Sequence, residues 1–292
     1  MNYEDILNKG LNKPQTVGVI NPYDSSTIEA INQVLETTDQ IQFKLYGQVE
    51  SMSHFEDIDN EQIELNLYDH NEDALKACFN DLKLGQFDVL MKGLIETKLL
   101  LKKVINKDYN LIESGQLLSH IALFDIPTYE KPIWITDCAM NLYPDLDAKK
   151  RILDNTIESV FKVGYDNICV GILSATETVN PKLQSSVDAD QLAKEYINNE
   201  HIHIDGPLAL DIAISKHAIE QKNLQLDTNG ACDVLLVPSL DVGNVLYKSL
   251  IYFANANVSG ILVGAKHPIV LTSRADSAQD KFNSLRLALS VQ

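Results

Sequence analysis

"TVGVINPYDSSTIEAINQVLET" (Thr16–Thr37) joins a short β-branched run to a segment with helical periodicity. Thr16–Ile20 has the composition of a buried strand, and Ser25–Thr37 has the pattern of an amphipathic helix. This strand-then-helix unit recurs along almost the whole chain. Such repetition predicts an α/β fold with a mostly parallel sheet and helices on both faces.

The remaining elements are predicted from the same two patterns. The other predicted strands are Ile41–Gly47, Ile63–Tyr68, Phe87–Gly93, Ile121–Ile126, Pro132–Thr136, Asn167–Leu173, His201–Gly206, Cys232–Pro238, Gly260–Ala265 and Pro268–Ser273. The other predicted helices are Asn71–Lys83, Glu96–Asn106, Asp145–Val163, Val187–Asn198, Leu208–Gln221, Gly243–Asn255 and a final helix with the buried stripe Ala278, Phe282, Leu285 and Leu289.

Composition limits the classes of function. The 292 residues are 45% hydrophobic and 22% charged, which is typical of a soluble globular protein large enough for two lobes. The net charge of −17 argues against a nucleic-acid partner, because phosphate neutralisation requires a basic face. The chain lacks an apolar run of membrane-spanning length, and "MNYEDILNKGLNK" at its start lacks the apolar stretch of a signal peptide. We therefore expect a cytoplasmic location and no membrane partner.

Common catalytic and metal-binding motifs are missing from the sequence. GxGxxG, GxxxxGK[ST], HExxH and GxSxG do not occur in it. His201 and His203 share one face of a predicted strand but lack a matching carboxylate cluster, so we expect no metal site. The cysteines are widely spaced without a CxxC pair, which predicts buried free thiols in a reducing compartment. They are Cys78, Cys138, Cys169 and Cys232.

Polar loops follow several predicted strands. In α/β sheets, ligands bind beyond the carboxyl ends of the strands, where "MKG", "TDCAMN", "DGPLALD", "PSLDVGN" and "TSRADS" lie. Lys92 precedes Gly93 and a helix N-terminus, which suits an anion, although an ordinary solvated lysine fits equally well. Asp241 and Gly243 precede another predicted helix. Gly243 permits a tight turn or the close approach of a ligand, and Asn244 is either a ligand contact or a helix cap.

The stretch "VLTSRADSAQDK" (Val270–Lys281) contains one of only three arginines. Arg274 stands just before a predicted helix N-terminus, where a guanidinium opposes the helix dipole. It is expected either to hold an anion such as phosphate together with the helix amides, or to pair with Asp276 or Asp280. Capping by Asp276 or Ser277, with the side chain of Gln279 or Asp280 reaching back, explains the same aspartates without a ligand.

Seven stretches form a recognisable set: "LMKGLIET", "LLSHIALFDIP", "WITDCAMNLYPDLDAKK", "VNPKLQSSVDA", "DGPLALDIAIS", "VPSLDVGNVLYKSLIYFA" and "VGAKHPIVLTSRADS". With them the chain resembles the phosphate acetyl/butyryl transferases, and most closely the butyryl branch. The resemblance spans about Phe87 to the C-terminus and is most specific from Asp205 onward.

The resemblance implies two α/β/α lobes of the isopropylmalate-dehydrogenase-like kind with a cleft between them. The first lobe is expected to comprise residues 1–128 plus about 268–292, including the C-terminal helix, and the second residues 129–267. The implied reaction is butyryl-CoA + phosphate = butyryl phosphate + CoA, by direct transfer in a ternary complex. CoA and phosphate are then substrates without a tightly bound cofactor, and a homo-oligomer is expected because relatives assemble as dimers or larger. A phosphate acetyltransferase, or a metal- and NAD-dependent decarboxylating dehydrogenase on the same fold, is the alternative.

The resemblance also implies the site residues. The family's Ser-Arg pair and the Asp six residues after the Arg correspond to Ser273, Arg274 and Asp280. We expect Arg274 to hold phosphate, Ser273 to donate to the developing oxyanion, and Asp280 to serve as a base or to orient the thiol. The acetyl branch uses further arginines, so here Lys92, Lys98 or helix N-termini must replace them. The remaining expected substrate-binding residues are Thr97, Thr136, Asp137, Asn141, Asp241, Gly243 and Asn244.

Overall fold

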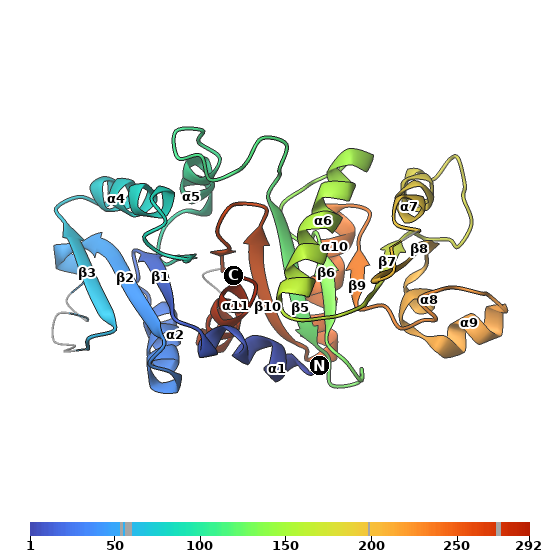
Figure 1. Ribbon diagram of the computed structural model, residues 1–292, viewed down its shortest axis with the longest axis horizontal. Coiled ribbons are helices and arrows are strands. Elements are labelled where there is room, and N and C mark those ends of the chain that lie inside the picture. The colour runs from blue at the N-terminus through green and yellow to red at the C-terminus, as the bar shows by residue number, and fades with distance from the viewer. Residues whose placement is uncertain (53–54, 56–59, 198, 273–275) are drawn as a thin grey trace. The chain divides into compact units, whose positions relative to one another are not determined.

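The computed structural model describes residues 1–52, 55, 60–197, 199–272 and 276–292. These residues form two compact units (Figure 1). We call Asn2–Leu118 together with Val258–Gln292 the split unit, and Ser119–Asn257 the middle unit. Both combine a sheet with helices, so the predicted α/β fold class is confirmed. Among the described residues, no helix is both long and apolar enough to cross a membrane.

The split unit contains a mostly parallel sheet. The strand order is β3 (Ile63–Tyr68), β2 (Ile41–Gln48), β1 (Gln15–Ile20), β4 (Val89–Lys92), β11 (Ile269–Val270) and β10 (Asn257–Val263). Its described pairs are parallel except β10 with β11. The helical segments are α1 (Tyr3–Asn8), η1 (Gly10–Asn12), α2 (Ser25–Thr37), η2 (Val49–Ser51), α4 (Asn71–Lys83), α5 (Thr97–Val104) and α11 (Ala278–Ser290).

The C-terminal helix α11 is buried on more than the single stripe that the sequence predicted. It packs against α1, η1 and α2, so polar side chains are enclosed together with Leu285 and Leu289. Buried polar side chains of α11 form hydrogen bonds. The Arg286 guanidinium donates to Glu4 Oε2 at 2.8 Å, and Ser284 Oγ accepts from Gly260 N at 3.0 Å. Hydrogen-bonded polar groups can be buried without the cost of an unpaired donor or acceptor.

The middle unit has a second sheet. Its strand order is β5 (Ser119–Asp125), β6 (Ile133–Thr136), β9 (Val234–Leu236), β7 (Ile168–Leu173) and β8 (Ile202–Leu208). β5 pairs with β6 antiparallel, and the other described pairs are parallel. The helices are α6 (Leu146–Lys162), α7 (Gln184–Glu195), α8 (Leu210–Ile214), α9 (Lys216–Lys222) and α10 (Leu240–Ala254). Lys149 Nζ of α6 donates to Asp188 Oδ2 of α7 at 2.6 Å, and this buried ion pair joins the two helices.

Several predicted boundaries are wrong. The continuous helix predicted for Leu208–Gln221 is interrupted at Ser215, whose backbone is extended and whose hydroxyl caps α9 by accepting from Ala218 N at 3.3 Å. The "DGPL" segment belongs to β8 rather than to a loop, and Asp205 Oδ2 accepts hydrogen bonds from the backbone N–H and hydroxyl of Thr228.

Candidate active site

Lys92 is the last residue of β4 and is buried, with 4% of its surface exposed. Its Nζ donates to the backbone oxygens of Gly93 at 3.3 Å and Thr272 at 3.4 Å. The chain must turn tightly after Lys92, because a Cβ on Gly93 would lie 2.1 Å from the Asn21 oxygen. The sheet therefore fixes a buried positive charge beside Thr272, the residue before Ser273.

The predicted Ser273–Arg274 pair lies outside the described residues. The third member of that predicted set, Asp280, sits in the first turn of α11 and forms a capping box with Ser277. Asp280 Oδ2 accepts from Ser277 N at 3.1 Å and from Ser277 Oγ at 2.7 Å, while Ser277 Oγ accepts from Asp280 N at 3.1 Å. Of the capping alternatives that the sequence allowed, the structure contains the Ser277–Asp280 pair, and one carboxylate oxygen of Asp280 is committed to it.

The residue after Asp280 anchors this turn, and the sequence analysis missed it. Lys281 is 3% exposed, and its Nζ donates to Asp24 Oδ1 at 2.5 Å and to Thr27 Oγ1 at 3.0 Å. Burial raises the pKa of the Asp24 carboxyl, but hydrogen bonds from Lys281, Thr27 and Ser26 and the charge of Lys281 outweigh it and lower that pKa to about 2. The pair fixes the first turn of α11 to the N-terminus of α2.

Thr97 is the first residue of α5 and is exposed, as is the next residue, Lys98. Glu96 occupies the N-cap position without a capping side-chain hydrogen bond. The amides of the first turn of a helix lack intrahelical partners, so this turn can serve an anionic ligand.

In the middle unit, the predicted loop after β6 is organised around Asp137. This residue is 3% exposed, and its Oδ1 accepts from Ala139 N and Met140 N, both at 2.9 Å. Its Oδ2 accepts from Asn141 Nδ2 at 2.6 Å. Thr136, the residue before it, is fully buried and donates its hydroxyl to the His120 backbone oxygen at 3.0 Å. Thr136, Asp137 and Asn141 thus form one ordered loop, in which Asp137 and Asn141 bind each other.

Helix α10 packs directly on this loop. It begins at Leu240, earlier than predicted, so Gly243 and Asn244 lie within the helix, and Asn244 is not its N-cap. Gly243 is the contact point, because a Cβ there would lie 2.5 Å from the Asp137 backbone oxygen. Asp241 accepts a hydrogen bond from the Tyr143 hydroxyl at 3.1 Å. The structure therefore brings the predicted residues of the β6 loop and the α10 N-terminus together, while Asn244 is exposed.

A mostly apolar pocket of about 660 Å³ lies beside this part of α10. It is bounded by the end of β7, the start of α7 and the outer face of α10, with Asp241 at its edge. Members of its lining include Leu173, Leu183, Val242 and Val245. The pocket lies at the carboxyl ends of β7 and β9, where α/β sheets bind ligands.

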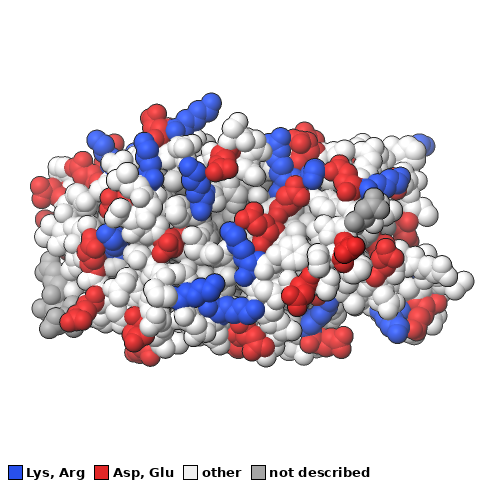
Figure 2. Space-filling view, in the orientation of Figure 1, with Lys and Arg blue, Asp and Glu red and all other residues white. Residues whose placement is uncertain are grey.

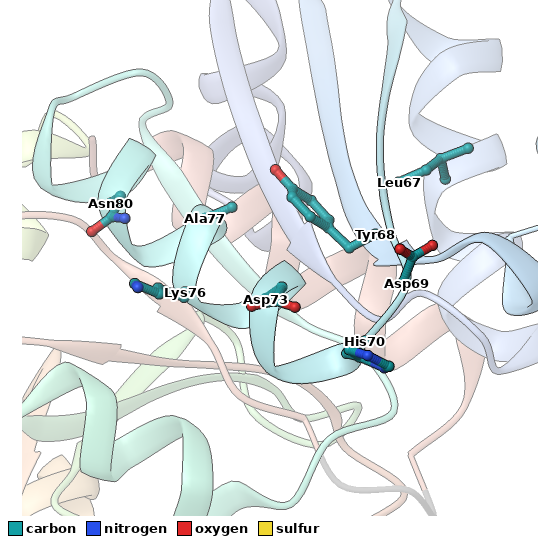
Figure 3. Close-up of a pocket in the computed structure, with 8 residues that line it drawn as sticks. All are labelled: Leu67, Tyr68, Asp69, His70, Asp73, Lys76, Ala77 and Asn80. Carbon is teal, nitrogen blue, oxygen red and sulfur yellow. The ribbon is translucent and has the colours of Figure 1, made fainter.

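The split unit contains a different, polar pocket of about 510 Å³ (Figure 3). Its lining comes from the end of β3 and from α4, and it includes Asp69, His70, Asp73 and Lys76. Carboxylates and a lysine alternate there, unlike the concentrated positive charge that a phosphate site requires. No motif residue lines this pocket, and its charge pattern does not suit phosphate, so we do not include it in the candidate active site.

The fold and the polar loops after its parallel strands place the chain among α/β proteins that bind ligands at the carboxyl ends of their strands. Residues 4–289 match the family described as Phosphate acetyl/butaryl transferase, and the chain belongs to that family, as its motifs predicted.

Individual relatives agree with this assignment. The chain is 39% identical to the "Probable phosphate butyryltransferase" of Bacillus subtilis (strain 168), over 99% of this chain and 97% of that protein. A solved structure, a branched-chain phosphotransacylase from Enterococcus faecalis V583, is similar with a TM-score of 0.85 and 33% identity, covering 95% of this chain and 98% of the other. A putative 4-hydroxythreonine-4-phosphate dehydrogenase from Salmonella typhimurium shares the fold alone, with a TM-score of 0.61 and 10% identity over 96% of this chain and all of the other.

Proposed function

We propose that this chain exchanges CoA and inorganic phosphate on a short-chain acyl group: butyryl-CoA + phosphate = butyryl phosphate + CoA. The family match over residues 4–289 carries the proposal, and the 39% identity to a probable phosphate butyryltransferase supports the butyryl group. The position of Lys92 supports an anionic substrate, because its ammonium lies at the carboxyl end of β4 and donates to the Thr272 oxygen next to the Ser273–Arg274 motif.

The proposed reaction requires charge stabilisation at two points. Arg274 holds phosphate bidentately, and Lys92 supplies the second positive charge that the family's further arginines supply elsewhere. Ser273 donates a hydrogen bond to the oxygen of the acyl carbonyl as negative charge develops on it. Asp280 orients the CoA thiol, since one of its carboxylate oxygens already accepts two hydrogen bonds from Ser277. Direct transfer in a ternary complex then obtains much of its rate from proximity.

The substrates require no tightly bound cofactor in this proposal. We further propose a cytoplasmic location, which the free cysteines support. All four cysteines are described and unpaired, and three are buried. Small anions rather than nucleic acid fit the charge of the surface, since Lys and Arg side chains lie among Asp and Glu side chains on the face in Figure 2.

The decisive experiment mixes the purified chain with butyryl-CoA and phosphate and follows CoA thiol release with a thiol reagent. We expect release that depends on phosphate, and a kcat/KM series over acetyl-, propionyl-, butyryl- and branched acyl-CoA that peaks at butyryl. Neighbouring chain lengths will overlap, because one methylene contributes only about 1–3 kcal/mol of discrimination. Thiol release without phosphate dependence, or NAD(P) reduction at 340 nm with a hydroxy acid, refutes the proposal.

A matched pair of lysine variants tests the anion site. Lys92→Met should raise the KM for phosphate at least tenfold, because it removes a buried charge worth about 1.4 kcal/mol or more to the bound anion. Lys102→Met is the control, because Lys102 is exposed in the last turn of α5, away from the N-terminal turn that can serve an anion. Equal KM values for the two variants would remove Lys92 from the site.

We also propose that the chain forms a homodimer through the outer face of α10. Of the residues of α10, only Gly243 is buried. Val245, Tyr252 and Phe253 are 66%, 75% and 88% exposed, and their spacing places them on one side of the helix. Two exposed aromatics of about 150–250 Å² each provide a large part of the roughly 800 Å² per partner that a stable interface buries.

A second copy fits this face because the face is self-complementary. The apolar pocket adjoins Val242 and Val245 in the N-terminal half of α10, and the protruding Tyr252 and Phe253 lie in its C-terminal half. Antiparallel pairing of two α10 helices about a two-fold axis places each aromatic pair at the partner's pocket and closes the assembly.

Light scattering at micromolar concentration tests the dimer. We expect twice the chain mass of 32.6 kDa for the wild type and a single chain mass for Phe253→Glu. Leu84→Glu is the control, since Leu84 is 69% exposed in the split unit. A monomeric wild type, or a dimer unaffected by Phe253→Glu, contradicts this interface.

A further inference from the structure

Helices α11 and α2 of the split unit meet near their N-terminal ends. Lys281 of α11 is 3% exposed, and its ammonium donates to Asp24 Oδ1 at 2.5 Å and to Thr27 Oγ1 at 3.0 Å. Asp24 is the N-cap of α2, and it accepts from Thr27 N at 3.0 Å and from the Thr27 hydroxyl at 2.7 Å. The ion pair therefore joins the two helices, and α2 itself holds the Asp24 carboxylate in place.

Stability alone does not account for a buried lysine at this place. The N-terminus of a helix carries a partial positive charge, so an ammonium where two such ends meet opposes both helix dipoles. Relative to apolar side chains of similar volume, a buried ion pair often adds no stability, because removing both charges from water offsets their attraction. What the pair adds is direction, since its hydrogen bonds fix the positions of both side chains. We therefore looked for a group whose orientation depends on it.

The residue before Lys281 is Asp280, whose carboxylate belongs to the same turn. Lys281 N donates to the Ser277 backbone oxygen at 3.1 Å, and Asp280 Oδ2 accepts from Ser277 N and Oγ. Successive residues of an α-helix are rotated by about 100° around its axis. With Lys281 fixed against α2, the rotation of this turn is fixed, and Asp280 is directed to a partly exposed side of the helix. The direction of the other carboxylate oxygen, Oδ1, follows from that rotation.

Other polar contacts of α11 act on later turns of the helix. The Arg286 guanidinium donates to Glu4 Oε2 of α1 at 2.8 Å, and Ser290 Oγ accepts from Gly10 N of η1 at 3.0 Å. Both residues lie more than one turn beyond Asp280, and their contacts hold the middle and the end of α11. The Lys281–Asp24 pair, in contrast, acts directly on the turn that contains Asp280.

We propose that Asp24 and Lys281 are positioning residues for the acyl exchange, and that their ion pair holds the Asp280 carboxylate in the direction that the CoA thiol requires. The assignment rests on the proposed function, in which Asp280 contacts the thiol. It applies equally to an orienting carboxylate and to a base, because both act only in the correct geometry. Neither Asp24 nor Lys281 touches a substrate in this role. A displacement of about 1 Å can lower a rate about 100-fold, so losing the pair should affect mainly kcat.

The test compares Lys281→Met with Arg286→Met. Lys281→Met removes the ammonium but keeps an apolar stem, and it leaves Asp24 with its hydrogen bonds from Thr27 and a side chain that is 25% exposed. We expect kcat for acyl-CoA formation to fall about 10- to 100-fold, with the KM values for butyryl phosphate and CoA changed less than threefold. Arg286→Met is the matched control, because it removes another buried, ion-paired cation from the same helix. Its kcat should stay within about threefold of the wild type.

A double-variant cycle with Asp280→Asn separates positioning from a general loss of structure. If the pair acts through Asp280, Lys281→Met should lower kcat no further in the Asp280→Asn background. A further fall there, a wild-type kcat in Lys281→Met, or an equal loss in Arg286→Met overturns the assignment. Melting curves check that each variant is folded at the assay temperature. If Lys281→Met does not fold, Asp24→Asn replaces it in the cycle, because Asn keeps the cap of α2. Absence of phosphate-dependent thiol release in the wild type would instead refute the proposed function itself.

Discussion

Replacing Asp24 by Asn removes the carboxylate that pairs with Lys281 and leaves that buried ammonium without its counter-charge. The pKa of Asp24 falls from its ordinary value of 3.8 to about 2 in the folded chain. At about 1.36 kcal/mol per pKa unit, this fall corresponds to about 2 kcal/mol of stability at neutral pH. Asn retains an oxygen that can cap α2 at Thr27 N, so the loss reports chiefly on the charge.

The pH dependence of this loss has a definite sign. A carboxyl with a lowered folded pKa stabilises the fold above its unfolded pKa, near 3.8, and that contribution disappears as the pH falls toward about 2. We therefore expect Asp24→Asn to melt roughly 4–8 °C below the wild type at pH 7. The difference should shrink steadily between pH 4 and pH 2.5, because the Asp24 carboxyl of the unfolded wild type takes up a proton there while that of the folded chain stays mostly ionised.

Thermal unfolding followed by circular dichroism at pH 7, 5, 4 and 3 measures this effect. Glu64→Gln is the control, since Glu64 pairs with Lys44 at 3.2 Å but is 56% exposed, and such pairs contribute about 0–1 kcal/mol. A difference between Asp24→Asn and wild type that is the same at pH 3 as at pH 7, or no larger than that of Glu64→Gln, would refute the reasoning.

Three further variants test other contacts. Gly243→Ala should lower the free energy of unfolding by about 1–3 kcal/mol despite alanine's higher helix propensity, because the new Cβ would lie 2.5 Å from the Asp137 backbone oxygen. Urea unfolding measures this loss, and Asn244→Ala at an exposed position of the same helix is the control. Asp188→Asn should cost about 3–5 kcal/mol, because it strands a buried lysine, and the same unfolding curves measure it. Arg274→Gln should lower kcat/KM for phosphate at least 30-fold in initial-rate measurements. This factor corresponds to about 2 kcal/mol, the contribution of the charge-assisted hydrogen bonds that the variant loses.

The parts of the fold that the sequence predicted well are those controlled by neighbouring residues. α2 and α4 have the bounds that periodicity predicted, and α6 begins after its predicted cap, Asp145, which accepts from Ala148 N at 2.9 Å. Periodicity and caps act within one or two helical turns, so they can be recognised in a linear sequence. The break at Ser215 is also local, but its signal, a serine in a long apolar pattern, is weak.

The candidate site depends on contacts that no local pattern contains. Lys281 and Asp24 form an ion pair although they are 257 positions apart in the sequence. In the sequence, Asp24 is recognisable only as the residue before a predicted helix. Gly243 was recognised as a place of close approach, but what approaches it is the Asp137 backbone.

The two aspartates of the motif loops, Asp137 and Asp280, both accept hydrogen bonds within their own segments. Asp137 uses both carboxylate oxygens to order its own loop, and Asp280 uses one to cap α11. These hydrogen bonds fix the position of each carboxylate, and a fixed carboxylate is suited to orienting a neighbouring group. Under the proposed function we therefore expect Asp280→Asn to lower kcat by the same factor from pH 6 to pH 9, because Asp280 orients the thiol. A factor that changes across this pH range would instead identify Asp280 as the base.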